Sequence, residues 1–227
     1  MKIVAISDTH NRHDKLVIPE CDILIHAGDA TGRGRESEVR KFARWYQQQE
    51  AGYLIWVPGN HEKDFEDCMP HSLQWFKEEC PDGHILINNS INIEGINIYG
   101  SPVTPWFHDW AWNEYRGQIA NTWAKIPNNT NILITHGPPY QILDELVYAD
   151  GSPRGEFVGC WSLAERIKEL KDLDLHIFGH IHNQAGQKHI NGVSYYNVSI
   201  CDESYYPSNP ITIIDYKELN ENKLQSK

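Results

Sequence analysis

The feature of this sequence that most constrains its fold is a series of short β-branched runs, each of which ends in a polar cluster. Runs of this kind are typical of buried strands, and Gly, Asp, Asn and His directly after them are typical of loops. We therefore predict strands over these ranges: Lys2 to Ser7, Asp22 to Ala27, Tyr53 to Val57, Ile96 to Gly100, Asn131 to Thr135, Leu175 to Phe178 and Val193 to Val198.

Helix-like stretches lie between the earlier runs, whereas the C-terminal part returns to strands with short connections. The predicted helices are Ser37 to Gln49, Glu114 to Lys125 and Ser162 to Leu170. Such a mixture favours an α/β fold in which two mixed sheets pack on each other and helices cover their outer faces.

The composition is that of one globular domain. The chain has 227 residues, 40% of them hydrophobic, with 8 Trp, 11 Tyr and 6 Phe, and a disordered chain would be short of such aromatics. No repeat or low-complexity linker divides it. We expect a single domain over residues 1–215, followed by a frayed polar tail over residues 216–227.

Charge and cysteine usage limit the partners and the compartment. There are 31 acidic against 20 basic residues, a formal net charge of -11, so long nucleic acids are not expected as partners. No apolar run approaches the ~20 residues of a membrane helix, and the short run after Met1 is not a signal peptide. The 5 cysteines form no C-x-x-C pair, which favours a reducing cytoplasm. The oligomeric state is not specified by these features.

The polar clusters at the strand ends carry the chemistry. They are Asp8-Thr9-His10, Gly28-Asp29, Gly59-Asn60-His61-Glu62, Thr135-His136-Gly137 and Gly179-His180-Ile181-His182. Each alone is ordinary turn chemistry. Together, at strand ends that converge on one edge of a sheet, they predict a metal site. Carboxylate, amide and imidazole ligands point to manganese, iron, zinc, nickel or cobalt rather than to calcium or an iron–sulfur cluster.

One aromatic segment differs from this pattern of strands followed by polar clusters. Ser101 to Trp112 follows a strand and contains two prolines and four large aromatic residues. We predict a loop that forms either a small satellite core or the wall of a ligand pocket, and the sequence favours the satellite core.

The order of these motifs resembles the calcineurin-like metallophosphoesterases. The longer phrases Ser7 to His10, Pro58 to Glu62, Thr104 to Phe107 and Thr135 to Pro139 are similar to the brain-type metallophosphoesterase-domain-containing branch, close to the class III cyclic-nucleotide phosphodiesterases. The resemblance covers about residues 2–201. It implies a four-layer α/β/β/α sandwich of two mixed sheets with helices outside.

The resemblance also implies two divalent transition-metal ions. The family pattern assigns one ion to Asp8, His10, Asp29 and His182, and the other to Asp29, Asn60, His136 and His180. Asp29 would then bridge cations ~3.5–4 Å apart, and a bridging water would lose its proton to become the attacking hydroxide. Manganese is the first expectation, with iron, zinc, nickel and cobalt as alternatives.

His61 is the predicted catalytic side chain. It stands beside the ligand Asn60, and the resemblance likewise assigns it to donation toward a substrate oxygen. In related protein serine/threonine phosphatases an Asp pairs with this histidine, but here that position is Gly32, which leaves the partner of His61 open. Arg33 stands where those phosphatases bind phosphate, or it is simply a surface residue between glycines.

The predicted activity is hydrolysis of small phosphodiesters, with 2′,3′- or 3′,5′-cyclic nucleotides as the favoured class. A diester carries one negative charge, which suits a centre with a small positive excess. Asn60, Trp106 and Phe107 are predicted to contact the substrate, the two aromatic rings by stacking on a base. The alternatives are a phosphomonoesterase or protein phosphatase, and a non-enzymatic scaffold, which the complete ligand set disfavours.

Overall fold

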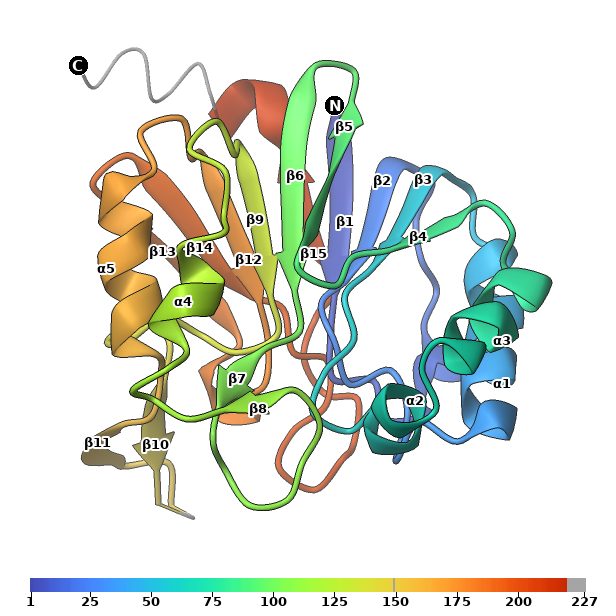
Figure 1. Cartoon of the computed structure of the whole chain (residues 1–227), viewed down its shortest axis with the longest axis horizontal. Coiled ribbons are helices and arrows are strands. Elements are labelled where there is room, and N and C mark those ends of the chain that lie inside the picture. The colour runs from blue at the N-terminus through green and yellow to red at the C-terminus, as the bar shows by residue number, and fades with distance from the viewer. Residues whose placement is uncertain (149, 220–227) are drawn as a thin grey trace.

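Two large β-sheets form the centre of the molecule, seen in a computed structural model that describes residues 1–148 and 150–219 (Figure 1). The first sheet has the strand order β15-β1-β2-β3-β4. Strands β1 to β4 run parallel, and β15 runs antiparallel to β1. The bounds are β1 Lys2–Ile6, β2 Cys21–His26, β3 Ala51–Trp56, β4 Gly83–Ile85 and β15 Thr212–Asp215.

The second sheet has the strand order β13-β14-β12-β9-β6-β5. Its four inner strands are parallel, and the edge strands β5 and β13 are antiparallel to their neighbours. The bounds are β5 Asn89–Ile93, β6 Ile96–Ser101, β9 Ile132–Thr135, β12 Leu175–Phe178, β13 Gly186–Ile190 and β14 Val193–Asn197. Two short pairs lie in the loops, namely β7 Thr104–Pro105 with β8 Asn113–Glu114 and β10 Glu145–Val147 with β11 Pro153–Phe157.

Helices cover the outer face of each sheet (Figure 1). Beside the first sheet lie α1 Glu36–Gln47, α2 Lys63–Asp67 and α3 His71–Glu79, and beside the second lie α4 Ala120–Trp123 and α5 Trp161–Glu169. Two 3₁₀ turns, η1 His13–Lys15 and η2 His182–Gln184, complete the elements. The predicted four-layer α/β/β/α sandwich is therefore confirmed.

Alternation along the strands explains this layering. In β1, Ile3 and Ala5 belong to the core between the two sheets, whereas Val4 packs with Phe42 and Tyr46 of α1 on the outer side. Successive side chains of a strand point to opposite faces, so a strand covered on both sides is apolar throughout. This is why the short runs of the sequence are continuous rather than alternating.

The seven predicted strands are confirmed, with ends that shift by one or two residues. The predicted helix over residues 114–125 is wrong, because only Ala120–Trp123 is helical and Glu114 belongs to β8. There the Glu114 carboxylate accepts a hydrogen bond from the Thr122 hydroxyl (2.8 Å), and Tyr115 stacks on Trp106. Tertiary contacts thus override the helical pattern in the first half of that segment.

The first residues of the predicted frayed tail are ordered and partly buried. Tyr216 is buried in the core between the sheets, and its hydroxyl donates to an Asp174 carboxylate oxygen (2.7 Å). The backbone is helical over residues 216–219, and the rest of the predicted tail, residues 220–227, lies outside the described residues.

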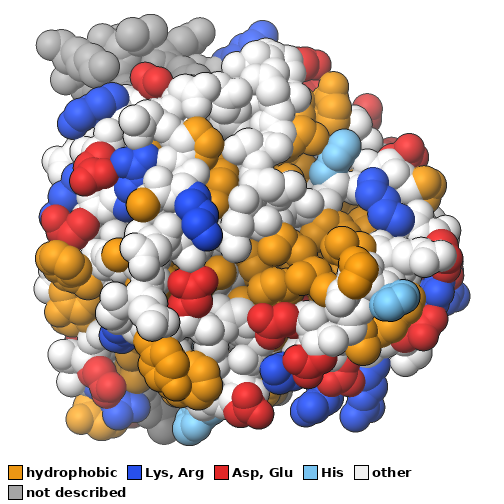
Figure 2. Space-filling view, in the orientation of Figure 1, with side chains coloured by type: hydrophobic (Ala, Val, Ile, Leu, Met, Phe, Trp, Pro, Cys, Tyr) orange, Lys and Arg blue, Asp and Glu red, His pale blue; other side chains and the backbone are white. Residues whose placement is uncertain are grey.

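The surface is mixed in charge. On the face drawn in Figure 2, acidic and basic side chains are interspersed and hydrophobic side chains gather near the middle. Among the residues that the structure describes, no helix has the length and apolar character needed to cross a membrane.

Candidate metal centre

All seven predicted metal ligands lie just beyond the carboxyl ends of parallel strands. In the first sheet, Asp8 and His10 follow β1, Asp29 follows β2 and Asn60 follows β3. In the second sheet, His136 follows β9, while His180 and His182 follow β12. The centre thus forms where the corresponding edges of the two sheets meet, as expected for an α/β fold.

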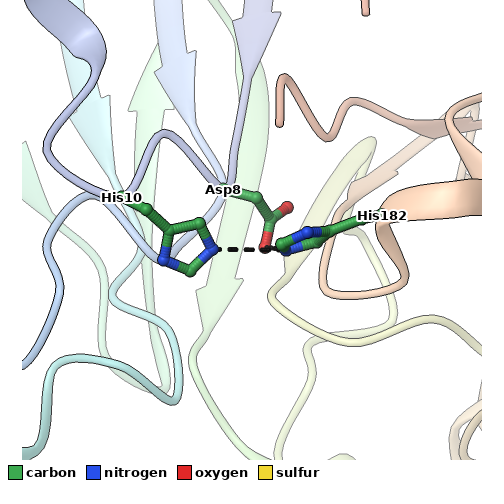
Figure 3. A group of neighbouring side chains, drawn as sticks. All are labelled: Asp8, His10 and His182. Carbon is green, nitrogen blue, oxygen red and sulfur yellow. Dashed lines mark hydrogen bonds and ion pairs between the residues drawn. The ribbon is translucent and has the colours of Figure 1, made fainter. Parts of the chain in front are cut away.

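The first group of ligands is Asp8, His10 and His182, whose side chains point toward one another (Figure 3). The Nε2 atoms of His10 and His182 lie 3.2 Å apart, and His182 Nε2 lies 3.4 Å from Asp8 Oδ1. Donor atoms at this separation can surround a single cation, and their chemistry suits a divalent transition metal.

The second group is Asp29, His136 and His180, joined by Asn60. His136 Nε2 lies 2.8 Å from Asn60 Oδ1 and 3.4 Å from Asp29 Oδ2. The same Asp29 oxygen lies 3.9 Å from His10 Nε2 of the first group. Asp29 Oδ2 therefore stands between the two groups, where a carboxylate shared by two cations would stand.

The backbone at the centre adopts an uncommon conformation. Asp8, His10, Asp29 and His180 have φ values of 53°, 40°, 55° and 71°. Residues other than glycine rarely occupy this left-handed region, and such strain gathers at functional sites. This left-handed conformation turns the backbone sharply after each strand and directs these side chains toward the centre.

Two motif glycines leave room for the ligands. A Cβ atom on Gly179 would collide with the Asp8 carboxylate, and one on Gly28 would collide with the His136 ring. Gly28 also has a φ of +105°, which L side chains rarely adopt. The glycines of the Gly-Asp and Gly-His phrases are therefore required because ligand side chains approach their backbone closely, as well as for turn formation.

The carboxylates of Asp8 and Asp29 are each held mainly through one oxygen, and the other oxygen faces a neighbouring imidazole. Asp8 Oδ2 accepts hydrogen bonds from the Ser7 and Ser199 hydroxyls (2.5 and 2.8 Å) and from the His180 backbone N–H (3.0 Å). Asp29 Oδ1 accepts the His61 backbone N–H (2.8 Å). These contacts fix both carboxylates before any ligand arrives.

The imidazoles are oriented in the same way. His136 Nδ1 donates to the Ala27 carbonyl (3.0 Å), and His182 Nδ1 donates to the Asp202 carbonyl (2.9 Å). Because a carbonyl can only accept, the proton is on Nδ1 and Nε2 faces the centre. Such backbone partners commonly fix the ring orientation of metal-binding histidines.

Buried Glu62 joins two of the ligand loops. One of its carboxylate oxygens accepts the backbone N–H groups of Gly59 (2.5 Å) and Asp29 (3.0 Å), and the other accepts the N–H (3.0 Å) and hydroxyl (2.9 Å) of Thr31. The last residue of the Gly59 to Glu62 phrase is thus a support rather than a ligand.

Ion pairing keeps both carboxylates charged. Burial raises the pKa of Asp8, but the hydrogen bond and charge of His182 outweigh it and hold that pKa well below its usual range. Burial opposes the protonation of His182 and His136, yet Asp8 and Asp29 raise their pKa values to about 9. A bound cation would replace these protons, because imidazole must be neutral at Nε2 to ligate.

The catalytic candidate His61 lies against the first ligand group. Its ring stacks on Trp110, with ring centres 4.3 Å apart, and meets His10 edge to face at 4.5 Å. Its Nδ1 donates to the Gly32 carbonyl (2.9 Å). This contact leaves Nε2 as the nitrogen that could act on a substrate oxygen, and Nε2 can donate only when both ring nitrogens carry a proton.

A cavity of about 300 Å³ opens over the centre. The predicted residues Asn60, His61 and Phe107 line it, together with the ligands Asp29, His180 and His182. Trp106 does not, and it lines a neighbouring pocket instead. The aromatic segment therefore divides, because Ala111 and Trp112 are buried in a core cluster whereas Phe107 and Trp110 form cavity wall.

Several residues of the site have little or no signal in the sequence. Tyr205 lines the cavity and its ring lies 4.6 Å from that of His10, but no motif surrounds it. Trp110 was part of the aromatic segment without a role of its own. Ser199 carried a weak signal, since Asn197 and Ser199 are polar residues at the end of β14.

The fold and the ligand cluster define an α/β sandwich protein with a metal-binding site at its strand ends. A profile of the calcineurin-like phosphoesterases matches residues 1–184. The human metallophosphoesterase domain-containing protein 1 is 36% identical over 234 residues, covering 94% of this chain and 70% of the human protein. The chain belongs to the calcineurin-like phosphoesterase family, and is accordingly a metal-dependent phosphoesterase.

Solved structures support the same fold. The phosphopantetheinyl hydrolase PptH from Mycobacterium tuberculosis aligns with a TM-score of 0.60 and 16% identity, over 95% of this chain and 97% of that one. A structure described as a novel archaeal phosphodiesterase aligns with a TM-score of 0.51 and 18% identity, over 96% and 95%. Both likenesses concern the fold.

Proposed function

We propose that this chain is a dinuclear phosphodiesterase that hydrolyses small phosphodiesters, with 2′,3′- or 3′,5′-cyclic nucleotides as the natural class. The observation that carries the dinuclear assignment is the position of Asp29 Oδ2, 3.4 Å from His136 and 3.9 Å from His10. When bound, two divalent cations would supply Lewis acidity to phosphoryl oxygens and lower the pKa of a water for attack on phosphorus.

The chain's own residues would complete the reaction. In its doubly protonated form, His61 would give the Nε2 proton to the oxygen of the leaving group, while its Nδ1–H stays bonded to the Gly32 carbonyl and Trp110 keeps the ring in place. Asn60 would hold its amide beside both the second ligand group and the substrate phosphate. Positioned acid–base groups of this kind typically contribute about 10²–10⁴ in rate.

The charge of the cavity supports a diester rather than a monoester. Within the part of the chain that the structure describes, the side chains lining the cavity include Asp29 and Glu203 but no Lys or Arg. Arg33 is not among them, and it pairs with Asp64 at 2.9 Å. A monoester dianion would therefore lack the cationic partners on which protein phosphatases of this superfamily rely, whereas a diester monoanion needs fewer.

Small substrates are also supported by the surface. The net charge of -11 and the interspersed charges in Figure 2 favour entry of a small anion to the centre over binding of a nucleic-acid polymer. The free thiols of all five cysteines agree with a cytoplasmic place of action, which we include in the proposal.

The test is a substrate panel with defined metals. We expect chelation to abolish activity and manganese to restore it, with iron, zinc, nickel and cobalt as comparison ions. The kcat/KM should be higher for bis(p-nitrophenyl) phosphate and the two cyclic nucleotide classes than for p-nitrophenyl phosphate. A tenfold lead of the monoester would favour the phosphomonoesterase alternative, and full turnover without metal would contradict the mechanism.

A further inference from the structure

A second pocket of about 300 Å³ adjoins the metal centre on the side of His180. Six of its residues define what we term the side pocket: Trp106, Phe107, Pro138, Leu146, Val158 and Ile181. Phe107, Leu146 and Ile181 also line the cavity over the centre, so the two spaces share a wall. The lining is mainly apolar and aromatic, as in pockets that bind a small uncharged group.

Tyr115 and Arg116 support the residues that line the side pocket. Trp106 stacks on Tyr115 with ring centres 4.9 Å apart and an angle of 10° between the planes. The Arg116 guanidinium donates to the carbonyls of Val158 (2.9 Å) and Gly159 (3.1 Å). With one face of Trp106 covered by Tyr115, the indole is a fixed flat surface, which lowers the entropic cost of stacking a planar ligand.

The side pocket and His61 adjoin different ligand groups. His61 groups with His10 and Asp29, whereas the side pocket opens beside His180 of the other ligand group. A phosphodiester has two substituents, and a phosphate held across both groups would direct one toward His61 and the other toward His180. Since His61 is the proton donor of the proposed function, the substituent beside it is the leaving group.

We infer that, for an acyclic diester, the side pocket binds the substituent that stays on phosphorus, and that it selects a substituent with a flat aromatic part, such as the base of a nucleoside or an aryl ring. This inference rests on the proposed function, because it takes the leaving group to lie at His61. In hydrolysis the phosphorus–oxygen bond to the leaving group breaks and water supplies the new oxygen. The retained group leaves as part of the monoester product. In a cyclic nucleotide both ester oxygens belong to one nucleoside, so the ring opens and that nucleoside carries both the freed hydroxyl and the new monoester.

Two esters with one leaving group test this assignment. Bis(p-nitrophenyl) phosphate and methyl p-nitrophenyl phosphate both release p-nitrophenol, and they differ only in the retained group. Burying an aromatic ring should favour the bis ester about tenfold or more in kcat/KM. Val158→Trp fills the side pocket from a residue that does not line the main cavity, and should reduce this ratio to near one.

The matched control is Val17→Trp, which adds the same side chain at a position that is 88% exposed. It should keep the wild-type ratio, and metal content should be the same in all three proteins. If Val158→Trp lowers kcat/KM for both esters equally, the ratio is unchanged. The side pocket then does not bind the retained group and the inference is wrong.

A binding measurement separates this inference from the proposed function. Calorimetric titration of the metal-loaded protein with diphenyl phosphate and dimethyl phosphate requires no turnover. We expect diphenyl phosphate to bind at least tenfold more tightly, and Val158→Trp to remove the difference. If the wild type hydrolyses neither ester, the proposed function fails, whereas equal binding of the two phosphates would overturn the side pocket itself.

Discussion

The Nδ1 atom of His61 donates a hydrogen bond to the backbone carbonyl of Gly32 at 2.9 Å. Related protein phosphatases use an aspartate side chain from this position to pair with the histidine, and glycine has none. A main-chain oxygen holds the Nδ1 proton here without adding a negative charge beside the ring, and Nε2 needs a second proton before it can act as a donor. The flat face of the His61 ring stacks on Trp110, with ring centres 4.3 Å apart.

Replacing His61 should separate turnover from metal binding. We expect His61→Ala to keep its metal and to lose turnover by about 10²–10⁴, because the ring supplies a proton while its backbone N–H still holds Asp29. Elemental analysis and kcat for bis(p-nitrophenyl) phosphate measure the two effects. A metal-free His61→Ala protein would make the side chain a ligand instead.

A substitution at Trp110 tests whether stacking orients the His61 ring. Trp110→Leu should lower kcat by about 10–100-fold, since a misplaced catalytic group costs this much. In the His61→Ala background the same change should have little further effect, because the ring it positions is gone. Independent, multiplicative losses would show that Trp110 acts on something other than His61.

Asp29 should matter more for metal content than any ligand of one group alone. We expect about two equivalents of metal in the wild type, about one in His10→Ala and close to none in Asp29→Ala, because Asp29 is shared by both groups in the proposed centre. Elemental analysis after gel filtration gives these values. Asp14→Ala, which removes an exposed carboxylate, is the control, and equal metal in Asp29→Ala and wild type would refute the bridging position.

Gly179 should not tolerate even one methyl group. A Cβ atom there would meet the Asp8 carboxylate and the Ser7 hydroxyl, so Gly179→Ala should lower the free energy of unfolding by about 1–3 kcal/mol and reduce metal binding. Urea unfolding and metal analysis measure both. Gly117→Ala is the matched variant, since nothing lies within 4 Å of its added Cβ, and it should behave as wild type.

His176 should make the fold sensitive to acid. Burial lowers its pKa from 6.5 to about 3, and its Nε2 lies 2.8 Å from the Thr135 hydroxyl, next to His136. The folded state binds this proton less readily than the unfolded chain does. Its contribution is therefore present above pH 6.5 and lost as pH falls toward 3.

We expect about 2 kcal/mol of the unfolding free energy to be lost through His176 between pH 7.5 and 5. His176→Gln keeps an N–H donor but does not titrate, so its loss over this range should be smaller than that of the wild type by this amount. Urea unfolding of both metal-free proteins at the two pH values gives the difference. Parallel losses would mean that His176 is protonated in the folded state.

The sequence alone determined which residues are strand and which are candidate ligands. Short apolar runs such as Lys2–Ile6 form strands because they are covered on both faces, and that pattern is local. The candidate ligands could be predicted because each follows such a run within a few residues, so the chain order already places Asp8, Asp29 and His136 at strand ends. Even the two-layer core follows from the alternation of Ile3, Val4 and Ala5.

Only the tertiary structure decided which side chains act together. The position of Asp29 Oδ2 between the two ligand groups, the carbonyl partner of His61 and the division of Trp106 from Phe107 depend on loops that come together only in the folded chain. Glu114 is likewise in a strand rather than a helix because of its partner Thr122. The local sequence pattern shows only the periodicity of strands and helices. These contacts join residues that are distant in sequence, or they compete with local helix propensity, so they are decided by tertiary packing.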